Sequence, residues 1–305
     1  MYFVRMLAAF VLVFGLNGQV KASNLRDDVR PEPSPVLKIA NKVLNDKVSD
    51  RERAHLIRSN PEYAADLLQT LVADIEPGTK EENARIPLLW EVSVFAAEKN
   101  NREIMARILD ISIPKNNATV HNWQIAVIGG GLIFELSKNG KDPRNVIGEM
   151  VESDPLLNQR WQSLVRVSRK IVMDESQSLG IRYDALRIFA MSDWSVAKNV
   201  YQQLFSKKVV TDESDKALRL AAVTAIPDFN KDETTEFFVN RFSLLSFSER
   251  EKVCRVLSKN ERSATRLLQS LRSGIISPQQ FPRRAIQCFR ANASERVRRM
   301  AASIF

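Results

Sequence analysis

The sequence predicts an all-α protein, and more specifically an α-solenoid (an α/α superhelix) of HEAT-like helix pairs. Three observations support this. Apolar residues recur at helical spacing in many consecutive segments, and short polar or proline-containing turns separate these segments. No stretch alternates apolar and polar residues for long enough to indicate a strand. The 305 residues include only 10 glycines, which leaves few of the tight turns that an all-β chain uses.

The first 22 residues are typical of a signal peptide. A short basic region ends at Arg5, an apolar run covers Met6–Leu16, and Val20-Lys21-Ala22 offers small residues for cleavage after Ala22. The apolar run is too short for the roughly 20 residues that a spanning helix needs. We therefore expect a periplasmic or secreted mature chain that does not span a membrane. Retention of residues 1–22 as an N-terminal anchor is the alternative.

Residues 23–33 are polar and contain prolines, which predicts a disordered leader. Residues 34–305 form the helical-repeat domain. Its first helical face carries Leu37 and Ala40. Ser49 with Glu52 matches a capping box at the start of the next helix, and Pro61 opens the third helix at its first position.

The later helices follow the same pattern of apolar stripes between short turns. They are predicted at residues 84–98, 101–112, 122–139, 143–152, 155–173, 178–191, 195–206, 213–226, 231–242, 246–258, 261–272, 277–289 and 293–304. Short connections between so many helices predict antiparallel neighbours.

Internal similarity predicts the architecture. Four helices share an arginine that is followed three positions later by a small or β-branched residue. The arginines are Arg182, Arg219, Arg250 and Arg298, at intervals of 37, 31 and 48 residues. Two-helix repeats of this size stack into α-solenoids. The small residues that allow close helix packing are Ala185, Ala222 and Ala301.

Three consecutive glycines, Gly129, Gly130 and Gly131, interrupt an apolar helical run. Each costs roughly 1 kcal/mol relative to alanine in a helix, so another interaction must compensate. A phosphate-binding loop would need a preceding strand and a different glycine spacing. We interpret the glycines as structural, allowing the backbone to approach a neighbouring helix closely; a kink that contacts a ligand is the alternative.

The net charge of +9 is concentrated near the C-terminal end, because residues 250–305 contain thirteen Arg or Lys residues and three Glu residues. A basic end of this kind could bind nucleic acid, anionic lipid or an acidic protein, and we expect an acidic protein partner. The candidate binding residues are Arg283, Arg284, Arg296, Arg298 and Arg299. Arg298 is the weaker candidate among them because it shares the repeat position of Arg250, where a structural role is expected. The alternative is that all of these arginines belong to solvated helix faces.

The sequence offers no catalytic, metal-binding or cofactor-binding residues that we can assign. It has no serine-centred nucleophile motif, no His-Glu-x-x-His and no glycine-rich phosphate loop. Its two histidines are not at metal-ligand spacing. Cys254 and Cys288 fall on predicted apolar faces, and the sequence leaves open whether they pair. We therefore expect a non-catalytic protein without a cofactor.

Several segments resemble a family of secreted HEAT-repeat proteins typical of planctomycete-type bacteria. The resemblance covers nearly all of the mature chain. The segments that carry it are Ile86–Trp90, Asp110–Pro114, Asn122–Ile133, Arg182–Arg187 and Leu267–Ile276. In that family the helical array often accompanies a β-propeller domain and a c-type haem domain. This chain has no Cys-x-x-Cys-His motif and no room for a propeller, so the resemblance implies the repeat fold and the location.

These observations favour a non-catalytic, extracytoplasmic protein-interaction scaffold. The first alternative, which the resemblance suggests, is an accessory subunit of a periplasmic redox complex (a c-type cytochrome or dehydrogenase complex) with a haem-containing partner. The second alternative is a basic helical-repeat protein that binds nucleic acid, as the isoelectric point near 9.6 would allow. The signal peptide argues against nucleic acid as a partner.

Overall fold

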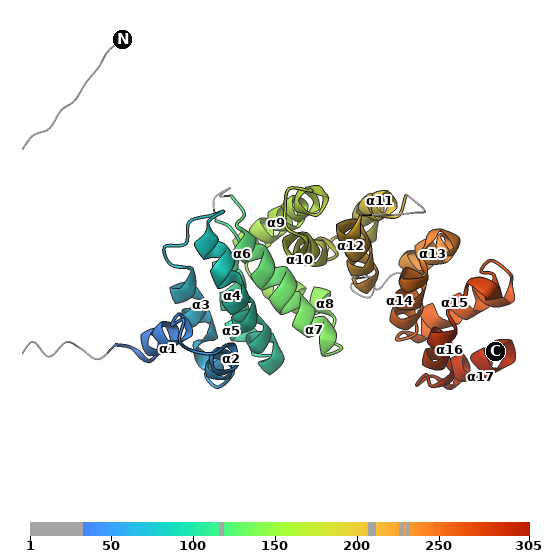
Figure 1. Cartoon of the computed structure of the whole chain (residues 1–305), viewed down its shortest axis with the longest axis horizontal. Coiled ribbons are helices and arrows are strands. Elements are labelled where there is room, and N and C mark those ends of the chain that lie inside the picture. The colour runs from blue at the N-terminus through green and yellow to red at the C-terminus, as the bar shows by residue number, and fades with distance from the viewer. Residues whose placement is uncertain (1–32, 116–118, 207–211, 226–228, 230–231) are drawn as a thin grey trace, which may run out of the picture. The chain divides into compact units, whose positions relative to one another are not determined.

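The computed structural model describes residues 33–115, 119–206, 212–225, 229 and 232–305. Over these ranges the secondary structure is helical and contains no strand, so the all-α prediction is confirmed (Figure 1). The expected signal peptide and all but the last residue of the expected leader lie outside the described residues. Ser34–Phe305 form one compact unit.

The helices of this unit are connected by short turns. Their bounds are α1 (Pro35–Val43), α2 (Asp50–Arg58), α3 (Ala64–Val72), α4 (Lys80–Lys99), α5 (Arg102–Ser112), α6 (Asn122–Ile125), the π-helix η2 (Ala126–Ile133), α7 (Phe134–Lys138), α8 (Pro143–Glu152), α9 (Pro155–Met173), α10 (Leu179–Phe189), α11 (Trp194–Leu204), α12 (Glu213–Thr224), α13 (Asp232–Asn240), α14 (Phe247–Leu257), α15 (Glu261–Arg272), α16 (Arg283–Arg290) and α17 (Glu295–Ile304). Short 3-10 helices cover Pro61–Tyr63 (η1), Phe242–Leu244 (η4) and Pro278–Gln280 (η5).

Side-chain caps explain where many of these helices begin, because the first backbone N–H groups of a helix have no partner within it. The Ser49 hydroxyl accepts from the N–H of Glu52 at 3.3 Å, as the sequence predicted, although Glu52 makes no return bond. A complete capping box stands at the start of α14. There the Glu249 carboxylate accepts from the N–H of Ser246 at 2.7 Å, and the Ser246 hydroxyl accepts from the N–H of Glu249 at 3.3 Å.

Two predicted helices begin differently in the structure. Pro61 opens a 3-10 turn, and the α-helix follows only at Ala64. The helix predicted for residues 277–289 is interrupted at Phe281, which adopts an extended conformation (φ −77°, ψ 125°), and α16 starts at Arg283. Pro282 explains the interruption, because a proline disfavours the helical conformation of the residue before it.

Helices pack against the next helix but one along much of the unit. In the C-terminal half, α10 packs on α12, α12 on α14 and α14 on α16, while α13 packs on α15 and α15 on α17. The N-terminal helices α1, α3 and α5 follow the same rule. The residues three positions after the four recurring arginines are buried without exposed surface: Ala185, Ala222, Val253 and Ala301. Small side chains at these positions therefore lie inside the helix packing.

The glycine-containing helix η2 packs against both α4 and α10. A Cβ on Gly129 would lie 1.9 Å from the backbone carbonyl oxygen of Asp184 in α10, and a Cβ on Gly131 would lie 1.7 Å from the Ser93 hydroxyl in α4. Neither distance is possible between non-bonded atoms. The absence of side chains on these glycines therefore allows η2 to approach both neighbours. This segment is wound as a π-helix, which the sequence did not predict.

Candidate partner-binding surfaces

Several arginines of the chain are used inside the fold, where they bind backbone carbonyl oxygens at the end of the preceding α-helix or in the turn that follows it. Arg250 in α14 donates to the carbonyls of Phe242 at 3.0 Å and Ser243 at 3.2 Å. Arg298 in α17 donates to those of Asn292 at 2.6 Å and Ala293 at 2.8 Å. The last carbonyls of a helix lack intrahelical partners and carry negative partial charge, so a guanidinium group is well suited to satisfy them.

The same contact recurs earlier in the chain. Arg182 in α10 donates from Nε to the carbonyl of Val172 at the end of α9, at 3.0 Å. Arg85 in α4 donates to the carbonyl of Leu71 at 2.8 Å. These arginines connect consecutive helices, so they are structural.

Arg219 differs from the other recurring arginines because it binds a carboxylate. Its Nε lies 2.7 Å from Oε1 of Glu249, and its Nη2 donates to Oε2 at 3.1 Å. The pair joins α12 to α14, and both side chains are almost fully buried. The guanidinium also lies 4.8 Å from the ring centroid of Phe205, a distance at which cation–π attraction operates.

The five arginines predicted to bind a partner lie on α16 and α17, and all are exposed. Arg298 binds backbone carbonyls, and Arg299 forms an ion pair with Glu295 at 2.5 Å, one turn earlier in α17. Arg283, Arg284 and Arg296 make no ion pair with a carboxylate in the described part of the chain. These three are therefore the cations of this surface that are available to a partner.

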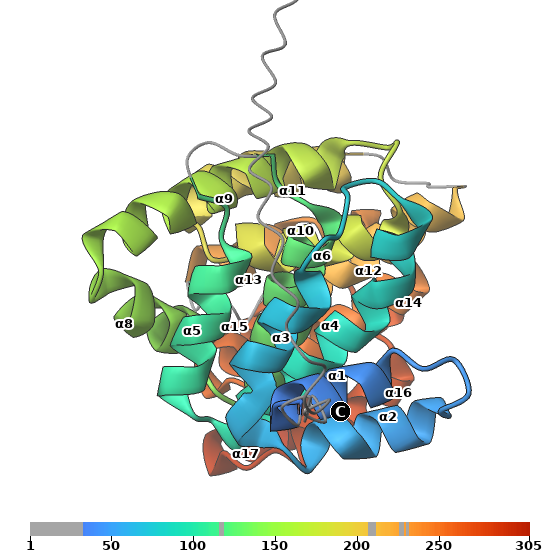
Figure 2. The same ribbon diagram turned by 90° about the vertical axis from the view of Figure 1, so that its left-hand side faces the viewer.

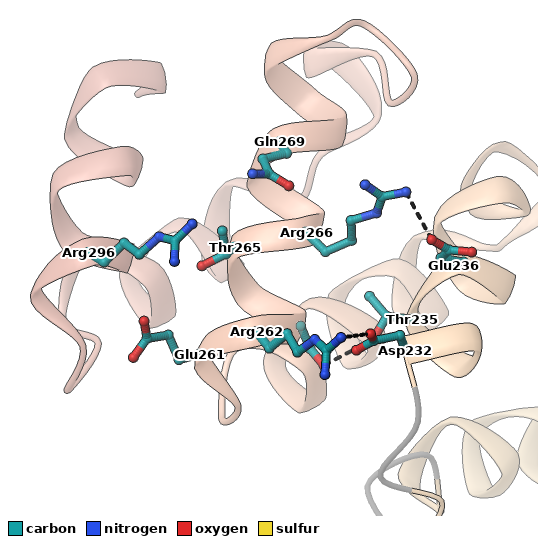
Figure 3. A pocket seen from close by; sticks show the side chains of 10 residues that line it. Asp232, Thr235, Glu236, Glu261, Arg262, Thr265, Arg266, Gln269 and Arg296 are labelled. Carbon is teal, nitrogen blue, oxygen red and sulfur yellow. Dashed lines mark hydrogen bonds and ion pairs between the residues drawn. The ribbon is translucent and has the colours of Figure 1, made fainter.

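Arg296 lies beside a shallow pocket of about 450 Å³ between α13, α15 and α17 (Figure 3). On its other side, Arg266 binds Glu236 at 2.9 Å and Arg262 binds Asp232. The Arg296 side chain extends from α17 toward Thr265, whose buried hydroxyl has no hydrogen-bond partner. Three acidic residues (Asp232, Glu236 and Glu261) and three arginines (Arg262, Arg266 and Arg296) line this pocket, so it carries no net charge. Arg296 is the arginine among them that forms no ion pair within the described ranges.

A larger groove of about 940 Å³ lies between α9 and α11, and residues of α8 and of the end of α10 also line it. Both helices run along the same edge of the unit (Figure 2). Trp161 and Val165 of α9 line it although they are almost fully buried, while Met173 of α9 and Val196 of α11 line it with apolar surface exposed. Arg169 and Lys170 stand on the rim. The sequence does not predict this groove, although residues 155–173 are predicted as a helix with apolar residues at helical spacing.

One buried acid lies away from these surfaces. The Asp184 side chain faces η2, and burial raises the pKa of its carboxyl group to about 8, while the nearby Arg187 opposes that shift. At neutral pH the folded chain therefore holds a protonated carboxyl there. No group of three or more His, Cys, Asp or Glu residues suited to a metal ion occurs among the described residues.

The two cysteines are free thiols in α14 and α16, two helices that pack together. Cys254 is buried and Cys288 is partly exposed. Burial, followed by the nearby Cys288 and Glu251, raises the pKa of the Cys254 thiol well above its usual value. Cys254 is therefore an unreactive member of the core.

Within the described ranges, no helix combines the length and the apolar character that crossing a bilayer requires. Comparison with known proteins gives no match to a family model, to a curated protein or to a solved structure.

Proposed function

We propose that this chain is a non-catalytic protein-interaction scaffold built of HEAT-like repeats, and that it binds an acidic partner protein outside the cytoplasm. The extracytoplasmic location rests on the signal-peptide pattern of residues 1–22. The repeat architecture is supported by the packing of each helix on the next but one, which is the arrangement expected of stacked helix pairs. The buried small or β-branched residue three positions after each recurring arginine supports it as well.

The observation that carries the partner chemistry is the division of the C-terminal arginines into two groups. Arg250 and Arg298 are engaged with backbone carbonyls. Arg283, Arg284 and Arg296 are exposed and, in the part of the chain that the structure describes, have no carboxylate partner. Neighbouring positive charges such as those of Arg283 and Arg284 repel each other, which costs folding free energy, and binding to an acidic surface would offset that cost.

Affinity capture from an envelope extract tests this function, with the mature chain as bait. We expect acidic proteins that are lost when the salt concentration rises, because exposed charges are screened within about 10 Å at 0.1 M ionic strength. The bait variant R283E/R284E should lose them at low salt. The matched control K42E/K47E reverses two exposed lysines at the start of the described chain and should retain them.

The same capture separates the scaffold from the alternative that the family resemblance suggests. A haem-containing or β-propeller protein among the captured partners would favour an accessory subunit of a periplasmic redox complex. Captured proteins that bind R283E/R284E as strongly as the unaltered bait would contradict the proposed role of the basic surface.

A further inference from the structure

We propose that the groove between α9 and α11 binds an acidic amphipathic helix of a partner protein. The proposal rests on the scaffold function, and it names a second contact surface together with the chemistry that fits it. It depends on the shape of the groove walls, on apolar surface left open between them, and on the charge of the rim.

One complete face of α9 lines the groove. From one helical turn to the next, its residues are three or four positions apart. They are Asn158, Trp161, Gln162, Val165, Arg166, Arg169, Lys170 and Met173. At 1.5 Å per residue this face is about 22 Å long. On the opposite wall, Val196 and Gln203 of α11 lie two turns apart on one face of their helix. Arg144, Gly148, Val151 and Glu152 of α8 complete the lining. Because the lining follows α9 over most of its length, the occupant must be elongated as well.

Apolar surface is left open in this groove. Trp161 and Val165 are almost fully buried beneath it. Met173 and Val196 stand at its sides with 40% and 49% of their surfaces exposed. Exposed apolar side chains that line a concave surface are typical of a binding site rather than of scattered surface residues. An occupant with an apolar stripe would cover them.

The charged residues around the groove determine whether an acidic or a basic occupant is favoured. Arg144 is engaged, because it donates to the carbonyls of Ala190 at 2.9 Å and Ser192 at 2.8 Å. Arg169 and Lys170 are exposed and form no ion pair with a carboxylate in the described ranges.

Further charged residues complete the rim. Arg166 donates to the Ser163 hydroxyl of its own helix at 2.8 Å. Among the described residues it forms no ion pair with a carboxylate. The groove is lined by two carboxylates, Glu152 and Asp193, and Asp193 lies 3.8 Å from Arg144. Complementary charge speeds association and excludes wrong partners, so the rim favours an acidic occupant.

A helix fits this groove better than an extended peptide. Both walls are faces of helices, whose backbone groups are already bonded within each helix, and they offer no strand edge to which an extended chain could add. A helical occupant satisfies its own backbone and presents apolar anchors at three- and four-residue spacing. About 15 residues of helix match the length of the α9 face.

A designed probe tests the proposal: a fluorescent peptide of about 15 residues with leucines at three- and four-residue spacing and glutamates at most other positions. The control peptide has the same composition, with the leucines distributed around the helix. We expect the mature chain to bind the first peptide at low salt and to bind the control at least about tenfold more weakly. V196E and R169E/K170E should each weaken binding by roughly tenfold or more.

Matched controls lie on the same two helices. L156E alters an exposed leucine of α9 outside the groove (70% exposed), and K198E reverses an exposed charge of α11 that does not line it. Both should bind the peptide like the unaltered chain. Circular dichroism of each variant identifies any loss of folding.

Three results would overturn the proposal: no binding of the probe, equal binding of the control peptide, or unchanged binding by a folded V196E variant. A V196E variant that dissociates a self-associated form of the chain would identify a second copy as the occupant, and it too would overturn the proposal. None of these results affects capture through Arg283 and Arg284, so the failure of the groove and the failure of the scaffold function are distinguishable.

Discussion

The carboxyl group of Asp184 occupies the space beside Gly130. A Cβ on Gly130 would lie 2.6 Å from Oδ1 and 2.7 Å from Oδ2 of Asp184, and 2.7 Å from Cδ1 of Trp90. Helix η2 therefore lies between α10 and α4 with no room for a side chain at this position. Close packing on both sides offsets the cost of about 1 kcal/mol that each glycine imposes on a helix.

The first prediction is that Gly129→Ala destabilises the chain. The added methyl group would meet the Asp184 backbone carbonyl, which cannot rotate away as a flexible side chain can. We expect a loss of roughly 1–3 kcal/mol in the free energy of unfolding, the usual cost of overpacking. Gly148→Ala in α8 is the control, because a Cβ there meets no atom within 4 Å. That variant should be as stable as the unaltered chain or about 0.4–1 kcal/mol more stable. Equal urea midpoints for the two variants would show that the glycines do not serve packing.

The second prediction concerns pH and Asp184. Its pKa is about 8 in the folded chain, against roughly 3.9 for an unfolded aspartate, so the folded state binds the proton more tightly. The contribution of this group to stability is therefore complete below about pH 4 and is lost progressively as the pH rises toward 8. Asp184→Asn should remove that part of the decline. The comparison is the urea midpoint of both proteins at several pH values across this range. Parallel pH profiles for the two proteins would contradict the protonated carboxyl.

The third prediction concerns the buried pair of Arg219 and Glu249. Arg219→Met leaves the Glu249 carboxylate buried without its cation. Such a change lowers the free energy of unfolding by roughly 3–5 kcal/mol. Adding Glu249→Gln should restore much of the stability, because glutamine carries no charge and still completes the capping box with Ser246. Arg299→Met is the control, since exposed pairs such as Arg299 with Glu295 contribute about 0–1 kcal/mol. A single R219M variant no less stable than R299M would contradict the importance of the buried pair.

The fourth prediction concerns the thiols. Because burial raises the pKa of the Cys254 thiol, little of the reactive thiolate forms near neutral pH. Iodoacetamide should therefore alkylate Cys288 in the folded chain and should modify Cys254 only after denaturation. Peptide mass spectrometry with and without urea distinguishes the two sites. Equal labelling of both cysteines under native conditions, or a disulfide between them, would count against this description.

Local signals in the sequence were enough to predict the helices. Ser49 caps α2 as expected, and the segments predicted at 143–152, 155–173 and 261–272 match α8, α9 and α15. These boundaries depend on caps, prolines and apolar spacing, which act over a few residues. The interruption before α16 was also encoded locally, by Pro282, but the apolar spacing of the segment concealed it.

The features that depend on distant residues were not predictable in the same way. The glycines indicated a close approach, but not that Asp184 and Ser93 would be the groups approached, nor that the helix would be wound with π-helical geometry. The recurrence of Arg182 and Arg250 was visible, whereas their carbonyl partners depend on how a helix turns back on the one before it. The groove between α9 and α11 has no counterpart in the sequence, because its two walls are separate predicted helices.

The central claim is that the C-terminal arginines divide into structural and partner-binding residues, and one paired measurement tests it most directly. R283A/R284A and R250A are compared for melting temperature and for the amount of acidic partner captured at low salt. We predict that R283A/R284A melts like the unaltered chain and captures much less partner. R250A, which loses its bonds to the carbonyls of Phe242 and Ser243, should lose roughly 1–3 kcal/mol of stability and still capture the partner while folded. If R283A/R284A captures as much partner as the unaltered chain, or if R250A melts unchanged, the division is wrong.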